Sequence, residues 1–235
     1  MNRTLAVDVG GSDLKLATLG VGGVTLTETT RTPTPRPATP ARVLEAIVSA
    51  ASDHRPFDRV AVGFPGVVEN GYALNAPNMD GAWDEIAIEQ RLSSKLACPV
   101  VVANDADVAG LGVLNTVTDS GRGVELVITL GTGLGAGLFV DGRLVPNLEL
   151  GHLPFDGGRT FEGWLGKAGL AELGRERWQQ RLVEALSVIR RAFNPARVYL
   201  GGGHARLVDA SILPSWVTIV GNRPGLLGCA FLYAP

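Results

Sequence analysis

The sequence predicts an α/β fold made of two similar halves. Apolar and β-branched residues at 4–9 (TLAVDV) and apolar residues at 14–19 (LKLATL) flank a glycine pair, a pattern typical of two strands joined by a tight turn. The pattern restarts near residue 124, where a second glycine-rich turn separates two more apolar runs. The two turns are offset by about 120 residues, half of the chain, which indicates an internal duplication.

In the first half, the residues after the turn predict strands and helices in alternation. Residues 24–31 alternate apolar and polar side chains as an exposed strand does, and the prolines within 33–40 form a stiff surface connector. From Ala41 onward, apolar residues recur at helical spacing. We therefore expect strands at 24–31, 59–64 and 100–103, and helices from residue 41, over 84–97 and over 109–114.

In the second half, strands again come first and helices dominate afterwards. The pair Asp141 and Gly142 predicts a tight turn between short strands. Apolar residues from Trp178 to Phe193 fall at helical spacing until Pro195 stops the helix. We expect strands at 125–130, 137–140, 144–145, 197–200 and 217–220, with a short helix at the end.

Charge and cysteine usage exclude several functions. The chain carries 21 basic and 23 acidic residues, a net charge of −2, so no whole-molecule field attracts nucleic acid or an anionic membrane. Cys98 and Cys229 show no CxxC spacing, so neither a disulfide framework nor a cysteine zinc site is expected.

The sequence also predicts neither a signal peptide nor a membrane span. The charged Asp8 comes after only a few apolar residues, which leaves no room for a signal-peptide apolar core, and no apolar run approaches the roughly 18 residues of a membrane span. We expect a soluble, cytoplasmic protein.

The first glycine turn carries residues suited to binding phosphate. Gly10 and Gly11 let backbone N–H groups approach phosphate oxygens, and Ser12 adds a hydroxyl. Asp8 is placed to hold Mg²⁺ through its water shell, and Lys15 to neutralise phosphate charge. The same residues also suit an ordinary hairpin turn.

The second glycine turn, TLGTGLGAG at 129–137, repeats this chemistry with Gly131, Thr132 and Gly133. Two such turns facing each other would clamp a phosphate chain. The segment is not a Rossmann motif, because a strand rather than a helix follows it, and no GxxxxGK[ST] motif occurs anywhere. A third run of Gly201, Gly202 and Gly203 suits either contact with a flat adenine or a strand-to-helix turn.

Polar residues after the predicted strands are candidates for catalysis and sugar binding. Asp105 follows a strand beside Asn104, where it suits a general base for a substrate hydroxyl or, alternatively, a helix N-cap. Glu149 and His152 (ELGH) suit recognition of sugar hydroxyls. The arginines within 175–191 make the long helix basic, which fits a solvated face or a track for an extended anion.

Six motifs in order resemble the ROK sugar kinases. They are VDVGGSDLK at 7–15, GFPG at 63–66, NDA at 104–106, TLGTGLGAG at 129–137, ELGH at 149–152 and LGGG at 200–203. The resemblance implies the actin-like ATPase fold of sugar kinases and Hsp70, a duplicated ribonuclease H-like fold of two lobes with a central cleft. It also implies an N-terminal lobe at 1–105 and a C-terminal lobe at 106–235, with the last helix packing back on the N-terminal lobe.

The resemblance also assigns roles. Asp105 becomes the catalytic base. The residues that would contact the sugar hydroxyls are Asn104, Asp105, Glu149, His152 and Glu162. The residues that flank Glu162 are unlike those of the family. Gly201, Gly202 and Gly203 become the adenosine-side loop, with Mg²⁺ near Asp8. Many members bind zinc through the ELGH histidine and a following CxCGxxGC segment, which this chain lacks. No zinc site is therefore expected.

The missing zinc segment and the phrase VDGRLVPNLELGHL resemble most the polyphosphate or ATP glucokinases within the family. The activity that this implies is phosphoryl transfer from ATP, inorganic polyphosphate or both to the 6-hydroxyl of glucose, with Mg²⁺, by a homodimer. Three alternatives remain open: a kinase for another hexose such as fructose, mannose or N-acetylglucosamine; a sugar or nucleotide sensor without turnover; and an actin-like ATPase acting on a protein partner.

Overall fold

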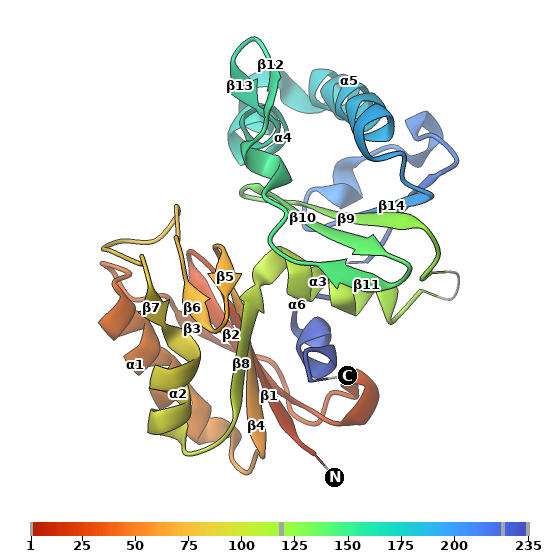
Figure 1. Ribbon diagram of the computed structural model, residues 1–235. Helices are drawn as coiled ribbons and strands as arrows, with labels where there is room; N and C mark the ends of the chain where they lie inside the picture. Colours follow the sequence, from red (N-terminus) through yellow and green to blue (C-terminus); the bar gives the residue numbers. More distant parts are fainter. Residues whose placement is uncertain (1, 118–119, 222–223, 234–235) are drawn as a thin grey trace. The chain divides into compact units, whose positions relative to one another are not determined.

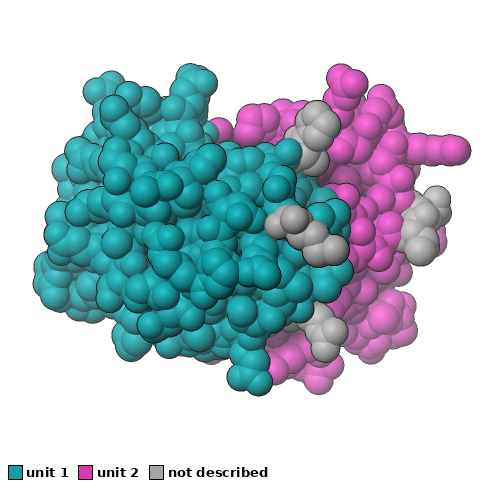
Figure 2. All heavy atoms as spheres, turned by 90° about the horizontal axis from the view of Figure 1, so that it is seen from below, with its two compact units in different colours: residues 1–112, 223–235 teal, residues 113–222 magenta. Residues whose placement is uncertain are grey.

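Each of two compact units contains its own five-stranded sheet. Figure 1 shows the computed structural model, which describes residues 2–117, 120–221 and 224–233. Unit 1 comprises residues 1–112 and 223–235, and unit 2 comprises residues 113–222; Figure 2 colours the two separately.

The sheet of unit 1 combines a hairpin with parallel strands. Its strands, in spatial order, are β3 (Thr30–Pro33), β2 (Asp13–Leu19), β1 (Thr4–Val9), β4 (Arg59–Phe64) and β8 (Val100–Asn104). β1 pairs with β2, and β2 with β3, in antiparallel fashion, whereas β1, β4 and β8 run parallel. The carboxyl ends of β1, β4 and β8 therefore share one edge, where α/β sheets place ligands and catalytic groups.

Both faces of this sheet are covered. Leu5, Val7 and Val9 of β1 face a core shared with α1 (Pro40–Ala51) and α2 (Ile88–Leu96). Ala6 points the other way, into a smaller cluster with Val108 of α3 (Asp105–Leu114) and Cys229. Because successive strand residues face opposite sides, a strand buried on both sides is largely apolar, and β1 is apolar except for Thr4 and Asp8.

Residues near the C-terminus cover the face of the unit 1 sheet that carries Ala6. α6 (Pro224–Leu227) and the 3₁₀ helix η6 (Gly228–Phe231) contact β1. The Tyr233 hydroxyl donates a hydrogen bond of 2.7 Å to the carbonyl oxygen of Val60 in β4. Cys229 is fully buried here, and burial raises the pKa of its thiol to about 12.

Two expectations for the first half are wrong in detail. Residues 24–31 do not form one strand: after the short 3₁₀ helix η1 (Val21–Gly23), Thr25 makes a single bridge to Leu19 of β2, and a strand begins only at Thr30 (β3, Thr30–Pro33). The helix expected over 84–97 begins only at Ile88. Glu85 takes a left-handed conformation (φ 54°), and β7 (Ile86–Ala87) pairs with β6 (Tyr72–Ala73), which also pairs with β5 (Val68–Glu69).

Unit 2 repeats the strand arrangement of unit 1. Its sheet order is β11 (Arg143–Val145), β10 (Leu134–Val140), β9 (Val124–Leu130), β14 (Arg197–Gly201) and β15 (Val217–Ile219). The first three strands pair in antiparallel fashion, and β9, β14 and β15 are parallel, as in unit 1. The predicted internal duplication is therefore confirmed.

One long helix covers a face of this second sheet. α5 (Lys167–Phe193) is interrupted at Gly174 (φ 71°) and buries Trp178, Leu182, Leu186 and Ile189 against residues of β9 and β14. It ends at Asn194, whose left-handed conformation (φ 44°) is a common helix stop, followed by Pro195. The smaller elements of this unit are the 3₁₀ helices η3 (Leu150–His152), η4 (Ala205–Leu207) and η5 (Ala210–Ile212), the hairpin of β12 (Pro154–Asp156) and β13 (Arg159–Thr160), and α4 (Phe161–Leu165).

None of the helices formed by the described residues has the length and apolar character needed to cross a membrane.

His54, in the 3₁₀ helix η2 (Ser52–His54), makes the stability of unit 1 depend on pH. Its ring is buried, with Nε2 2.7 Å from Thr30 Oγ1 and Nδ1 3.4 Å from Thr27 Oγ1. Burial lowers the pKa of His54, against the opposing charge of Asp53. The unfolded chain therefore binds a proton more readily, so stability is retained above the ordinary pKa of about 6.5 and lost as pH falls below it.

We expect the urea midpoint of the wild type to fall between about pH 7 and pH 5 more steeply than that of His54→Gln, which has no imidazole to protonate. Equal slopes for the two proteins would show that His54 is not the group responsible.

Candidate active site

The first glycine turn joins β1 to β2 at the carboxyl edge of the unit 1 sheet. Gly10 N–H donates a hydrogen bond of 3.0 Å to the Asp13 carbonyl oxygen, which closes the turn. The space beside Gly11 on its side-chain side is open: apart from Gly11 and its two chain neighbours, no described residue has an atom within 4 Å of the position that a Cβ would occupy. This turn therefore presents backbone to a ligand without a covering side chain.

Asp8 and Lys15 lie directly opposite each other in β1 and β2. Lys15 Nζ is 2.7 Å from Asp8 Oδ2, and the two side chains keep 35% and 22% of their surface exposed. Lys15 thus offsets the negative charge of Asp8 beside the turn, which lowers the electrostatic cost of bringing a phosphate there.

Asp8 fits only a metal site in which the protein supplies a single carboxylate and water or phosphate supplies the other ligands. Among the described residues no three His, Cys, Asp or Glu side chains cluster closely enough to hold an ion by themselves. Mg²⁺ in phosphoryl-transfer sites keeps several waters and takes only one or two carboxylates besides the phosphates. A single carboxylate at the edge of the turn matches that donor set, whereas an all-protein cage does not.

Asn104 and Asp105 stand at the junction of β8 and α3. Asn104 Oδ1 accepts hydrogen bonds from the N–H groups of Ala106 (2.9 Å) and Asp107 (3.2 Å), the geometry of a helix N-cap. Its Nδ2 donates to the Gly66 carbonyl oxygen at 3.1 Å. Asn104 therefore makes capping bonds at the start of α3.

The strand register brings Asp105 to the same edge as the first glycine turn. Asp8, Gly63 and Ala103 lie in one row across β1, β4 and β8. Two strand spacings separate the ends of that row, about 10 Å. Asp105 follows Ala103 by two residues, so its carboxyl group and the turn belong to one region of unit 1.

In unit 2, the second glycine turn is fixed by α4 and α5. Thr132 accepts a hydrogen bond of 3.0 Å at its carbonyl oxygen from Lys167 N–H, the first residue of α5. Glu162 Oε2 accepts one of 3.1 Å from Leu134 N–H. A Cβ on Gly133 would lie 2.3 Å from Glu162 Oε2, so a side chain there would displace the Glu162 carboxylate from its present position. The sequence did not predict that Glu162 touches the turn, since the contact joins residues 28 positions apart.

The Glu149–His152 pair and the three-glycine loop at 201–203 also lie beside this turn. Glu149 Oε2 is 3.4 Å from His152 Nδ1, and η3, which contains His152, contacts both β10 and α4. Gly202 (φ 84°) packs so closely on the end of β9 that a Cβ would lie 2.3 Å from the Leu130 carbonyl oxygen. The three-glycine loop and the second glycine turn therefore flank the same strand end.

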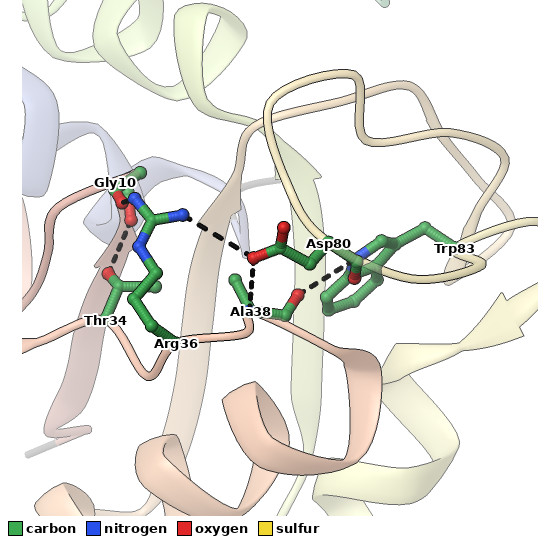
Figure 3. Close-up of polar contacts among 7 residues, drawn as sticks. Gly10, Thr34, Arg36, Ala38, Asp80 and Trp83 are labelled. Atoms are coloured by element: carbon green, nitrogen blue, oxygen red, sulfur yellow. Dashed lines mark hydrogen bonds and ion pairs between the residues drawn. The ribbon is translucent and has the colours of Figure 1, made fainter.

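A further group that sequence reasoning missed is the segment after β3. Thr34 and Arg36 bind carbonyl oxygens of the first glycine turn (Figure 3). The prolines around them predicted only a stiff connector. No local pattern could have shown this contact, because it depends on β3 pairing with β2.

The repeated five-stranded sheet, with a glycine turn after the first strand of each copy, defines the duplicated actin-like ATPase class of fold. The model of the ROK family matches residues 4–172, and this chain belongs to that family.

Among known proteins, polyphosphate glucokinase of Mycobacterium leprae is 29% identical over 97% of this chain and 70% of its own length. Its counterpart from Mycobacterium tuberculosis H37Rv is 29% identical over 95% of this chain and 84% of its own. The crystal structure of inorganic polyphosphate/ATP-glucomannokinase from Arthrobacter sp. strain KM matches with a TM-score of 0.88 and 34% identity, covering 99% of this chain and 98% of that one.

A ROK family glucokinase from Streptomyces griseus, crystallised with glucose and AMPPNP, has the same fold with a TM-score of 0.81. It is 22% identical, and the match covers 98% of this chain and 99% of that one.

We expect Asn104→Ala to lower the free energy of unfolding by about 1 kcal/mol, because two N–H groups of α3 lose their acceptor. Asn104→Ser keeps a capping oxygen and should lose less. Urea unfolding measures both; an Asn104→Ala protein as stable as the wild type would exclude the capping role.

Proposed function

We propose that this chain is a hexokinase-type kinase that transfers a phosphoryl group from ATP or inorganic polyphosphate to the 6-hydroxyl of glucose. The observation that carries the proposal is the position of Asp105 at the same sheet edge as the first glycine turn. A proton acceptor near a phosphate cradle is the arrangement that phosphoryl transfer to an alcohol requires. The activities named for relatives that cover nearly the whole chain support glucose as acceptor and both donors.

In this proposal Asp105 accepts the proton of the sugar 6-hydroxyl. At the same time the oxygen of that hydroxyl forms a bond to the terminal phosphorus of the donor. The bond between that phosphorus and the bridging oxygen breaks, and the leaving phosphate takes the electron pair. Phosphoryl transfer depends mainly on positioning and on stabilising charge, so the carboxylate acts by orienting the hydroxyl and removing its proton.

The glycine turns are assigned to the donor. Gly10, Gly11 and Ser12 would hold phosphate oxygens in unit 1, with Lys15 supplying positive charge. Gly131, Thr132 and Gly133 would do the same in unit 2. When the donor is ATP, Gly201, Gly202 and Gly203 are assigned to its adenosine. Bound Mg²⁺ would neutralise the phosphates, and Asp8 would hold it through water.

The sugar is assigned to polar side chains of each unit. Asn104 and Asp105 in unit 1, and Glu149, His152 and Glu162 in unit 2, are proposed to contact its hydroxyls. For Glu162 the contact with Leu134 N–H supports a second role, since the same carboxylate also fixes the second glycine turn.

We also infer a cytoplasmic homodimer that needs neither nucleic acid nor membrane. The balanced charge and the two free cysteines support this setting. The test of the assembly is the molar mass in solution by light scattering.

The decisive experiment measures glucose 6-phosphate formation by the purified protein with Mg²⁺ and glucose, using ATP in one reaction and inorganic polyphosphate in the other. Product with either donor supports the proposal and identifies the donor. A folded protein that makes none with either donor overturns it, and mannose, fructose and N-acetylglucosamine then test other acceptors.

Replacing Asp105 by Asn should lower kcat about 10²- to 10⁴-fold, the usual contribution of a general base, while glucose still binds. The matched control is Asp84→Asn, at an exposed position outside the candidate site, which should keep wild-type kcat. Steady-state kinetics measure the loss, and calorimetry with glucose measures binding. Near-full turnover by Asp105→Asn would remove Asp105 from the mechanism.

A further inference from the structure

All three carbonyl oxygens of the first glycine turn are bound from one neighbouring segment. Thr34 Oγ1 donates to the Gly10 carbonyl oxygen at 2.6 Å, and Thr34 N–H donates to that of Ser12 at 2.8 Å. The Arg36 guanidinium donates to the carbonyl oxygen of Gly11 between them. Thr34 is 4% exposed, so its bonds are shielded from water.

Binding the carbonyl oxygens fixes the direction of the amides. A trans peptide group is planar, and its C=O and the N–H of the next residue point in opposite directions. Holding the Gly10 and Gly11 carbonyl oxygens on the side of Thr34 and Arg36 therefore turns the N–H groups of Gly11 and Ser12 to the other side. N–H groups turned to one side of a turn form a concave anion site.

Asp80 holds this segment from its other end. Figure 3 shows Arg36 reaching both the turn and Asp80, with Arg36 Nη1 3.6 Å from Asp80 Oδ2. The same Oδ2 accepts a hydrogen bond of 2.6 Å from Ala38 N–H. The buried Trp83 indole N–H lies 3.3 Å from the Ala38 carbonyl oxygen and 3.2 Å from that of Asp80, which ties both loops together.

We propose that Thr34 and Arg36, held by Asp80, are positioning residues that aim the amides of the first glycine turn at the donor phosphates. The inference rests on the proposed kinase function, and it assigns to this segment the affinity for the phosphate donor rather than for the sugar. The guanidinium matters here for its shape, because two separate nitrogens reach the Gly11 carbonyl oxygen and the Asp80 carboxylate, whereas an ammonium group has a single nitrogen.

Four variants separate this role from a purely electrostatic one. Thr34→Val removes the hydroxyl at nearly constant volume, and Thr34→Ser restores it. Asp80→Ala releases Arg36 without changing its charge, and Arg36→Lys keeps the charge without the fork. Arg42→Ala, an exposed arginine on α1, is the matched control, and urea midpoints confirm that each protein is folded.

Three readouts are compared with wild type: KM for ATP and polyphosphate, KM for glucose, and hydrogen exchange of a peptide spanning residues 8–14. Thr34→Val, Asp80→Ala and Arg36→Lys should each raise the donor KM by about 3- to 10-fold, the effect of one lost hydrogen bond. They should speed amide exchange in the turn and leave the glucose KM unchanged. Thr34→Ser and Arg42→Ala should behave as wild type.

Two results would overturn the inference. Wild-type donor KM in both Asp80→Ala and Arg36→Lys would show that Arg36 acts through its charge alone. Faster exchange in Thr34→Val with an unchanged donor KM would show that the contacts only stabilise the fold.

Calorimetry with tripolyphosphate keeps the inference separate from the proposed function. If the wild type makes no sugar phosphate but binds tripolyphosphate, and Thr34→Val binds it more weakly, the proposed kinase is wrong and the positioning role stands. If the folded wild type does not bind tripolyphosphate, the turn holds no phosphate, and the inference is overturned as well.

Discussion

The planarity of the peptide group is the constraint on which the candidate site depends. A glycine turn can aim N–H groups at a ligand only if its carbonyl oxygens are held on the opposite side, because the C=O and N–H of one trans peptide group point in opposite directions. The first turn meets this requirement with Thr34 and Arg36, and the second with Lys167 N–H and an internal bond from Gly131 N–H to the Gly133 carbonyl oxygen. The same turn chemistry is thus supported by unrelated partners in the two units.

Duplication explains why the two turns occupy equivalent positions, and divergence explains what surrounds them. In both sheets the turn follows the central strand, which pairs with an antiparallel strand on one side and with a parallel strand on the other. Unit 1 places Asn104 and Asp105 at the end of its outer parallel strand, whereas unit 2 places α4 and the start of α5 against its turn. One scaffold therefore carries Asn104 and Asp105 at the end of its outer parallel strand in one copy, and helices packed against its glycine turn in the other.

Much of this fold follows from local sequence patterns. The β1–β2 hairpin, the duplication and the long helix were predictable because burial on both sheet faces or on one helix face imposes a period on the sequence. Residues 24–31 and 84–87 misled the prediction, since alternating polarity and helical spacing do not reveal a left-handed residue such as Glu85. The glycine turns were found from sequence, but Thr34, Arg36 and the contact of Glu162 with the second turn depend on tertiary packing.

The membership of residues 224–233 in unit 1 has a consequence for the order of folding during synthesis. Unit 2 is one continuous stretch of chain, complete before α6 and η6 leave the ribosome. Unit 1 is not: the sheet face that carries Ala6 and Ala61 waits for Cys229, which is made more than two hundred residues after Ala6. Until then this apolar face is covered only in part, by residues such as Val108 of α3, and such partly exposed apolar surface is what chaperones bind. The part of the protein made first is therefore the last to be finished.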